Sequence, residues 1–428
     1  MSLPRQSSLS SCVTLLCGLF AGGCAVGPDF KKPAAPEVSG YSTSPLETTA
    51  SAGGVTGGEP QRFVQGSDIS ADWWTLFHSA PLDELIEHSL TNNPDLKAAQ
   101  AALSVAREEV LAQRGVYYPS VSAGFSASRQ RESGQLAPTP NANVFLFNLF
   151  TPQVSVSYVP DVFGLNRRTV ESAQAQAEAV RFQMIATYNT LTANVVVTAI
   201  QQGSVQLQIE ATRELIDINT QTLEILRYQF AKGYASGLDV AAQESQLALV
   251  AATLPPLLKQ AAQLRDLMAT LAGEFPSQGP GGAFELGSLK LPQDLPVSVP
   301  ADLVTQRPDV RQAEADLHAA SAKIGVAVAN RLPNITLSAA TGSSALAINQ
   351  LFTTGTGFWS LGADLTAPIF QGGALLHQER AARAGYQQAR IGLVQAQASR
   401  YADTAALFQA LGGGWWHRQD LAADDHGK

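Results

Sequence analysis

Leu165 to Lys232 reads LNRRTVESAQAQAEAVRFQMIATYNTLTANVVVTAIQQGSVQLQIEATRELIDINTQTLEILRYQFAK, and this stretch decides the fold. It contains no proline and a single glycine, and alanine, glutamine, glutamate, leucine and arginine dominate it, all of which favour helices. Small and apolar residues recur every three or four positions, which predicts a helix with a narrow apolar seam like that of a coiled coil. The seam comprises Ala173, Ala177, Val180, Met184, Thr187, Leu191, Val195 and Thr198. As a helix, these 68 residues would span about 100 Å and would need partner helices of similar length.

The composition of the 428-residue chain narrows the class of protein. Its length allows two or three domains. Charged residues make up 15% of the chain and the formal net charge is −8, with no basic run, which argues against a nucleic-acid partner. No stretch after residue 24 is apolar for long enough to predict a transmembrane helix.

The first residues resemble the signal of a bacterial lipoprotein. Arg5 supplies a positive charge, and residues 12–20 form a short apolar segment. The following AGGC, which ends at Cys24, is similar to a lipobox and predicts a signal peptide over 1–23 with acylation of Cys24, palmitate included. An ordinary signal peptide with an incidental cysteine is the alternative. If Cys24 is the acceptor, the exported chain has no second cysteine and no disulfide. Ala25, rather than aspartate, after this cysteine favours the outer membrane, by resemblance to sorted lipoproteins.

Segments on the N-terminal side of the long helix predict a tether, helices and two strands. Residues 24–70 are rich in Gly, Ser, Thr and Pro and are typical of an extended tether. A short amphipathic helix is predicted at 82–90, and a longer one from about 94 to 115. Two stretches then alternate between apolar and polar residues as strands do, at about 116–128 and 144–159.

A turn is predicted at the far end of the long helix. The segment 233–239 contains two glycines that can end one helix, and a serine and an aspartate that can cap the next. A return helix is predicted over 238–253, so that the helical hairpin occupies 164–253. A further helix over 257–271 follows two prolines, and the proline-rich residues 274–300 read as a linker.

The chain also contains an internal duplication. Pro308-Asp309-Val310 repeats Pro94-Asp95-Leu96, and Pro333 repeats Pro119; both intervals, 94 to 308 and 119 to 333, are 214 residues. The predicted boundaries are 71–299 for the first repeat, 300–414 for the second and 415–428 for a polar tail, with strands of the second copy at about 335–342 and 358–367.

Two strands in each copy have about the length of a tilted membrane-spanning strand. Four strands cannot close a barrel, and an open edge cannot face lipid, so several chains must pool their strands. Three chains would give twelve, an even number within the bacterial range. The predicted fold class is therefore α-helical with a membrane β-barrel: four strands per chain, a trimeric twelve-stranded barrel, and a tunnel of long helical hairpins.

Motifs along the whole exported chain resemble the TolC-like outer membrane factors, specifically the lipoprotein NodT branch that serves resistance-nodulation-division efflux pumps. The motifs are CAVGPDF from Cys24, DWWTLF from Asp72, LDELIEHSLTNNPDL from Leu82, PDVFGLNRR from Pro160, LRYQFAKGYASGLDV from Leu226, VPADLVTQRPDVRQAEADLHAASAKIGVAVANRLPNITLSAATG from Val299, PIFQGG from Pro368 and ALGGGWW from Ala410. Their common order and spacing make the resemblance specific.

This resemblance implies a homotrimer in the outer membrane with a periplasmic extension, which exports drugs or other small molecules. Its implied partners are a periplasmic adaptor (membrane fusion) protein, an inner-membrane RND pump and outer membrane lipid. The adaptor would contact the hairpin tip, and a plain helix cap is the other interpretation of that turn; both can hold. The tip residues are Gly233, Tyr234, Ala235, Ser236, Gly237, Leu238 and Asp239.

The second copy departs from the family pattern. Gly164 to Leu247 spans 83 residues, but the matching interval from Gly372 to Ile391 spans 19, so about 64 residues of helical hairpin have no counterpart. A helix over 371–398 is predicted to continue into a final helix at 401–411. A trimer would then have three hairpins where the family has six, which predicts a destabilised, leaky or inactive duct.

The sequence does not indicate an enzyme. The six histidines lack metal-ligand spacing, GYASG at 233–237 lacks the spacing of a nucleophile elbow, and Gly355 and Gly357 do not begin a dinucleotide-binding motif. We therefore expect no catalytic residue, no metal ligand and no cofactor. The second functional class is a structural outer-membrane lipoprotein that derives from such a duct but transports nothing.

Overall fold

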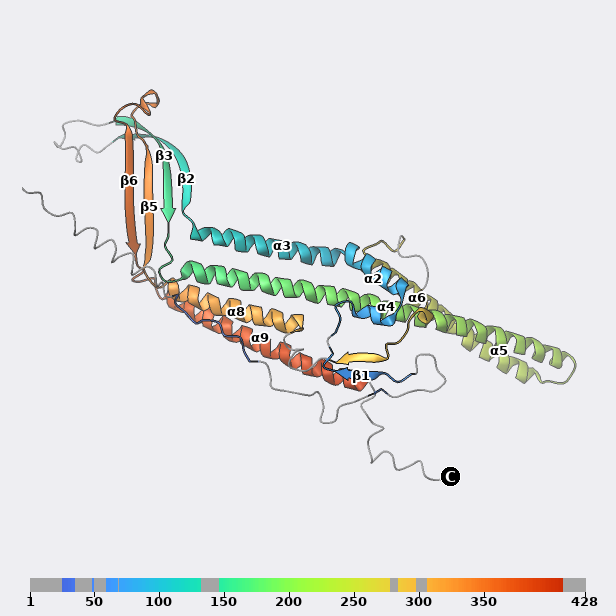
Figure 1. Cartoon of the computed structure of the whole chain (residues 1–428). Coiled ribbons are helices and arrows are strands. Elements are labelled where there is room, and N and C mark those ends of the chain that lie inside the picture. Colours follow the sequence, from blue (N-terminus) through green and yellow to red (C-terminus); the bar gives the residue numbers. More distant parts are fainter. Residues whose placement is uncertain are drawn as a thin grey trace, which may run out of the picture. The chain divides into compact units, whose positions relative to one another are not determined.

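The computed structural model describes residues 25–34, 48–49, 59–67, 69–131, 146–277, 284–297 and 306–410. The predicted signal peptide, Cys24 and the polar tail lie outside these residues. The chain forms two compact units that interleave along the sequence. Figure 1 labels their helices and strands. The first comprises Met1–Pro33, Ser104–Ala179 and Ala313–Val394, and the second Ala34–Leu103, Val180–Gln312 and Gln395–Lys428. Each predicted repeat therefore contributes residues to both units.

The first unit contains a four-stranded antiparallel sheet of order β2-β3-β5-β6. Its strands are β2 (Ser120–Arg131), β3 (Leu146–Tyr158), β5 (Asn334–Ser343) and β6 (Gly357–Thr366). The two copies meet at the central pair, β3 and β5. The first strand begins at Ser120 rather than at 116, because Gly115–Tyr117 forms a 3-10 turn (η2) that the amide of Tyr118 closes on the carbonyl of Gly115 at 3.1 Å.

Four helices cross from one unit into the other along the sequence: α3 (Pro94–Arg114), α4 (Leu165–Ala231), α8 (Pro308–Ala329) and α9 (Ala374–Ala410). The long helix is thus confirmed, and its 67 residues correspond to about 100 Å. Within the first unit, α4 and α8 approach closely because small residues lie between them. The hydroxyl of Ser172 donates to the carbonyl of Ala319 at 3.3 Å.

The core of the second unit forms on the middle of α4. Leu191, Val195 and Ala199 of α4 are at most 5% exposed and belong to one apolar cluster with Trp74 and Met268. The apolar stripe of α4 is wider here than the predicted seam, since Val196 and Ala199 are buried as well. The wider stripe packs against two further helices that supply core residues, α2 (Ala80–Asn92) and α6 (Leu254–Leu271). The tryptophan pair belongs to the 3-10 helix η1 (Trp73–Phe77), and Trp74 packs near Tyr188.

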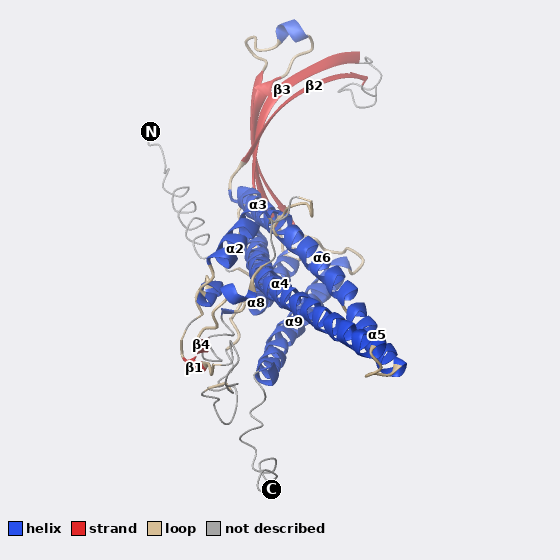
Figure 2. Cartoon of the chain, turned by 90° about the vertical axis from the view of Figure 1, so that its right-hand side faces the viewer, coloured by secondary structure: helices blue, strands red, loops and turns tan. Residues whose placement is uncertain are grey.

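The hairpin partner of α4 is α5 (Gly237–Ala252), which returns beside it (Figure 2). The guanidinium of Arg227 lies 2.7 Å from the carboxylate of Glu244, and the amide of Gln243 donates to Asn219 at 2.9 Å. The chain passes from α5 into α6 through a single residue, Thr253. The two prolines that follow fit there because the first turn of a helix does not need their missing amide hydrogens.

Two segments predicted to lack regular structure pair with each other. The parallel strands β1 (Arg62–Gln65) and β4 (Asp294–Val297) come from the predicted tether and from the predicted linker, so the prediction was wrong at these residues. Arg62 and Asp294 form a two-point ion pair at 2.9 and 3.0 Å. Because the two strands are 232 residues apart, neither sequence alone signals the pairing.

After β6 the structure describes a single helix, α9, of 37 residues, where the first copy has α4, α5 and α6. The predicted continuation of one helix into the next is confirmed, since α9 runs unbroken from Ala374 to Ala410. Its later part contacts the start of α8 through Arg307, which donates to Asp309 and, at 2.8 Å, to Asp403. No helix among the described residues combines the length and the hydropathy that crossing a bilayer requires.

Candidate functional site

The four-stranded sheet carries different side chains on its two faces. Along β2, the odd-numbered residues from Val121 to Ala127 are apolar, whereas the even-numbered residues from Ser120 to Ser128 are serine or glycine. Pairing extends both patterns across the strands, because residues in one register row point to the same face. One row runs through Val121, Val156, Ala339 and Leu361, and the next through Ser122, Ser155, Ala340 and Ser360.

The apolar face of the sheet is exposed rather than covered by a core. Phe125 is 58% exposed, and Trp359, Leu361 and Leu365 of β6 are each at least 70% exposed. Such a continuous apolar patch marks a surface that meets lipid or a partner. The opposite face carries mostly small polar side chains, as in the hydroxyl pair Ser122 and Ser155 at 2.9 Å. Three larger apolar residues, Phe147, Leu149 and Phe358, also lie on it, toward the end of the sheet away from the helices. Each outer strand, β2 and β6, has a paired neighbour on only one side among the described residues.

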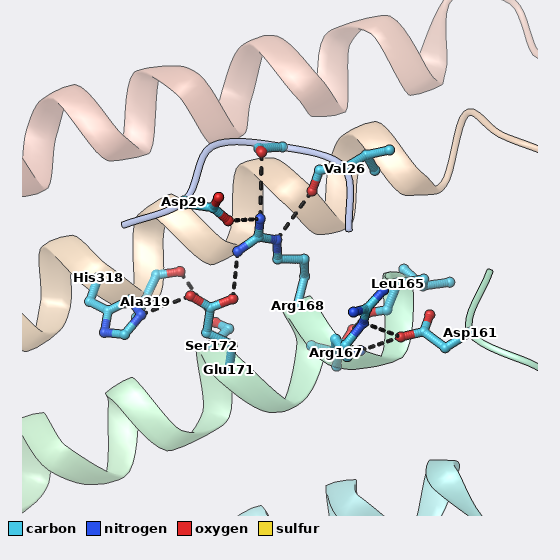
Figure 3. A network of polar contacts seen from close by, with 12 residues as sticks. Val26, Asp29, Asp161, Leu165, Arg167, Arg168, Glu171, Ser172, His318 and Ala319 are labelled. Carbon is cyan, nitrogen blue, oxygen red and sulfur yellow. Dashed lines mark hydrogen bonds and ion pairs between the residues drawn. The ribbon is translucent and has the colours of Figure 1, made fainter. Parts of the chain in front are cut away.

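A strap formed by residues 25–34 lies against the start of α4 and against α8 (Figure 3). The amide of Val26 donates to the carbonyl of Phe163 at 3.0 Å. Gly27, at φ +92°, lies so close to Gly325 that a Cβ on Gly27 would come within 2.4 Å of the Gly325 Cα. Ala25 approaches Gly164 at the junction of β3 and α4 equally closely. The strap therefore starts one residue after Cys24, at the point where strand becomes helix.

Arg168 holds the strap in place. Its side chain is 5% exposed and donates to the carbonyl of Val26 at 3.1 Å, to Asp29 at 2.7 Å and to Glu171 at 2.8 Å. Burial acts to lower the pKa of Arg168, but hydrogen bonds and charges from Asp29 and Glu171 outweigh burial and raise this pKa above its usual value. The guanidinium therefore stays charged and joins strap to helix by charge-assisted hydrogen bonds.

Two further contacts extend the strap along α8. The ring of Phe30 stacks on the imidazole of His318 with centroids 4.3 Å apart. The Nε2 of His318 lies 2.8 Å from the Oε1 of Glu171 (Figure 3). Lys32 forms an ion pair with Glu314 at 3.1 Å. One histidine and one glutamate thus connect the strap, α4 and α8.

The predicted hairpin tip is a turn between two capped helix ends, the C-terminus of α4 and the N-terminus of α5. Gly233, at φ +78°, ends α4, while the amide of Tyr234 bonds to the carbonyl of Gln229 at 2.9 Å, as in a Schellman motif. Ser236 and Asp239 form a reciprocal capping box at the start of α5. Hydrogen bonds from Ser236 hold the pKa of Asp239 below its usual range. The caps leave two large side chains outward, Tyr234 at 85% and Leu238 at 79% exposure.

The structure thus places four of the seven predicted tip residues, 233–236, in the turn and the other three, 237–239, in the first turn of α5, while Cys24 lies outside the described residues. Sequence reasoning missed the cluster around Arg168, because its members come from three distant segments. Two signals were present: Asp29 and Arg168 both fall inside motifs that carry the family resemblance. The described residues contain no group of three or more His, Cys, Asp or Glu side chains that could hold a metal ion.

Comparison with known proteins shows that this chain is similar to outer membrane efflux proteins in both sequence and fold. The model of the family described as outer membrane efflux protein matches residues 85–274 and 299–412. The probable efflux pump outer membrane protein SepC of Pseudomonas putida is 31% identical over 372 residues, which cover 82% of this chain and 72% of SepC. Nodulation protein T of Rhizobium leguminosarum is 28% identical over 360 residues, with coverages of 83% and 72%. The solved outer-membrane channel OprN superposes with a TM-score of 0.79 at 26% identity, covering 91% of this chain and 83% of OprN.

The matched regions include the long helix α4 and all four strands of the sheet. The family match confirms the resemblance that the sequence motifs carried, and the chain shares its fold with OprN, an outer-membrane channel. The chain belongs to the outer membrane efflux protein family.

Proposed function

We propose that this chain is the outer membrane duct of a tripartite efflux system, to which an inner-membrane pump and a periplasmic adaptor deliver drugs or other small molecules. The observation that carries the proposal is the two-faced sheet, with exposed apolar side chains on one face and small polar side chains on the other. Strands that alternate in this way fit a barrel wall between lipid and an aqueous lumen.

The two open edges of the sheet support assembly from several copies. Unpaired backbone groups on β2 and β6 cannot face hydrocarbon, where no water replaces the missing hydrogen bonds. Pairing β2 of one chain with β6 of the next satisfies both edges. Three chains then close a twelve-stranded barrel, which is the homotrimer that we propose.

The strap supports acylation at Cys24 after removal of residues 1–23. Ala25 contacts Gly164 where β3 ends, which is a membrane boundary in the proposed barrel. Acyl chains on the preceding residue would therefore enter the leaflet that surrounds the strand ends. Each buried CH2 group contributes about 0.8 kcal/mol to membrane binding, so several chains anchor firmly.

The hairpin tip supports contact with the adaptor. Its exposed residues, Tyr234 and Leu238, stand on a turn that two caps hold in one conformation, so binding needs little ordering of the chain. The remaining tip residues, Gly233, Ala235, Ser236, Gly237 and Asp239, shape the turn or lie within it. Capping and adaptor contact are compatible roles.

One observation favours a second candidate, a structural outer membrane lipoprotein that does not transport. The second copy has only α9 after β6, so a trimer would have three helical hairpins of the α4–α5 type. The hairpin of the single chain exposes apolar residues, such as Ile225 at 58% and Leu249 at 64%, which need partner helices in an assembly. We expect the barrel to form, and efflux to be weaker than that of a relative with two full hairpins per chain.

The test uses cysteines on adjacent residues of β2. Ser126→Cys lies on the small polar face and Ala127→Cys on the apolar face, and both positions are exposed. The full-length trimer is reconstituted in planar bilayers and treated with a charged methanethiosulfonate. The proposal expects ion conductance that falls after treatment of Ser126→Cys only. A wild-type chain without conductance would support the non-transporting lipoprotein, and equal block of both variants would contradict the assignment of faces.

A further inference from the structure

The four strands of the sheet contain three charged residues, and these are sorted by face. Asp364 of β6 lies on the small polar face, opposite Thr336. Arg129 and Arg131 of β2 lie on the other face, because their odd numbers continue the apolar series of Val121 to Ala127. The remaining two strands, β3 and β5, contain no charged residue. Two arginines on an apolar face therefore need an explanation.

The register shows that the apolar face becomes mixed where these arginines begin. Ala127 pairs with Phe150, the next row on this face pairs Arg129 with Asn148, and the last row pairs Arg131 with Leu146. Both strands thus become polar in the row of Arg129, and Leu146 is the one apolar residue beyond it on this face of the two strands. Arg129 and Arg131 are exposed, and neither forms an ion pair among the described residues.

The height of this boundary matches an outer membrane. Eight residues separate Val121 from Arg129, which is about 26 Å along the strand. If the strand tilts by about 40° from the barrel axis, this distance is about 20 Å along the axis. The apolar band of such barrels is roughly 25 Å tall. Since Val121 lies near the end of β2 that joins the helices, the arginines lie at the opposite, outer boundary.

We infer that Arg129 and Arg131 bind the phosphate groups of phosphorylated glycolipid in the outer leaflet. This inference rests on the proposed function, because it needs the apolar face to contact lipid. A guanidinium carries five donors in a planar fork that matches phosphate geometry. The described part of this face holds no carboxylate that could neutralise the two charges, and an anionic headgroup supplies that charge at the depth where the apolar residues end.

The experiment measures binding of diphosphoryl lipid A to the full-length protein in zwitterionic detergent micelles. We expect the double variant R129S/R131S to bind about tenfold or more weakly, since each residue loses charged hydrogen bonds. R129K/R131K keeps the charge but not the fork and should lie between the two. The matched control R107S/R380S removes two exposed arginines from helices α3 and α9 of the same unit and should bind like wild type.

Two further arms identify the ligand. Monophosphoryl lipid A should bind wild type more weakly than the diphosphoryl form, and inorganic phosphate alone should not displace the lipid. Equal affinity of wild type and R129S/R131S, or equal loss in the helix control, would overturn the inference, as would displacement by inorganic phosphate. The single variants R129S and R131S replace the double variant if its circular dichroism shows misfolding. Insertion of the wild-type protein into phosphatidylcholine vesicles is measured as a separate experiment. Failure to insert would contradict the proposed membrane barrel, and not only the binding of lipid A.

Discussion

Replacing Arg168 with alanine should release the strap without unfolding the helices that it lies on. The substitution removes donors to Glu171, to Asp29 and to the carbonyl of Val26. The contact with Asp29 counts for little, because that carboxylate is 88% exposed. The pair with Glu171 lies within α4, so its loss does not act on the strap directly. Loss of the buried, charged donor to the strap carbonyl should cost the docked strap about 1.5–3 kcal/mol. The strap would then open about 12 to 140 times more often.

Limited trypsin digestion of the full-length protein in detergent measures this opening through cleavage after Lys31. Cleavage reports the open population when closing is faster than proteolysis, so its rate should rise by the same factor. The control is Arg167→Ala, one residue away, where the side chain is 45% exposed and lies 3.5 Å from Asp161. This control should change the rate about fivefold at most. Cleavage of Arg168→Ala at the wild-type rate would refute the anchoring role of Arg168.

Three further predictions concern the strap and the tip. Gly27→Ala would place a Cβ against backbone and should speed strap proteolysis, whereas Gly355→Ala, at a similar φ of +93° but with open space, should only lower the melting temperature slightly. Leu238→Asp should weaken adaptor binding at least about fivefold in a titration while thermal unfolding stays unchanged, because the side chain is 79% exposed; unchanged affinity would contradict contact at the tip. The lowered pKa of Asp239 means that its cap with Ser236 is fully present above the unfolded pKa and is lost as pH falls through the folded value. Amide protection at the start of α5, measured as the exchange rate relative to the intrinsic rate at each pH, should therefore fall below about pH 4, and Asp239→Asn should remove that dependence.

Periodic features of this protein could be predicted from sequence because a single segment carries them. The spacing of Leu191, Val195 and Thr198 already marks a helix, and the serines of β2 already mark a strand with two different faces. The turn at Gly233 and the cap at Ser236 follow from local backbone chemistry for the same reason. These features need no knowledge of what lies nearby in space.

Features that depend on distant segments were not predictable in this way. The pairing of β1 with β4 joins residues 232 positions apart. Both segments read as loops because four-residue strands carry a weak pattern, and β4 also contains Pro296. Arg168 looked like one more polar residue at a helix start until the strap placed Asp29 and two carbonyls around it. Its burial is a property of the assembled unit and not of its own helix.

The alternation of the two sheet faces also restricts how the length of this protein can change. One inserted or deleted residue within β2 would exchange every later side chain of that strand between the two faces, bringing serines to the apolar face and residues such as Phe125 to the polar face. A helix can lose whole turns while its remaining residues keep their faces. The two copies differ in this sense, since the strands persist in both while the helical part after β6 is the shorter. Insertions and deletions among orthologues should therefore fall in helices and loops, and strand lengths should stay constant.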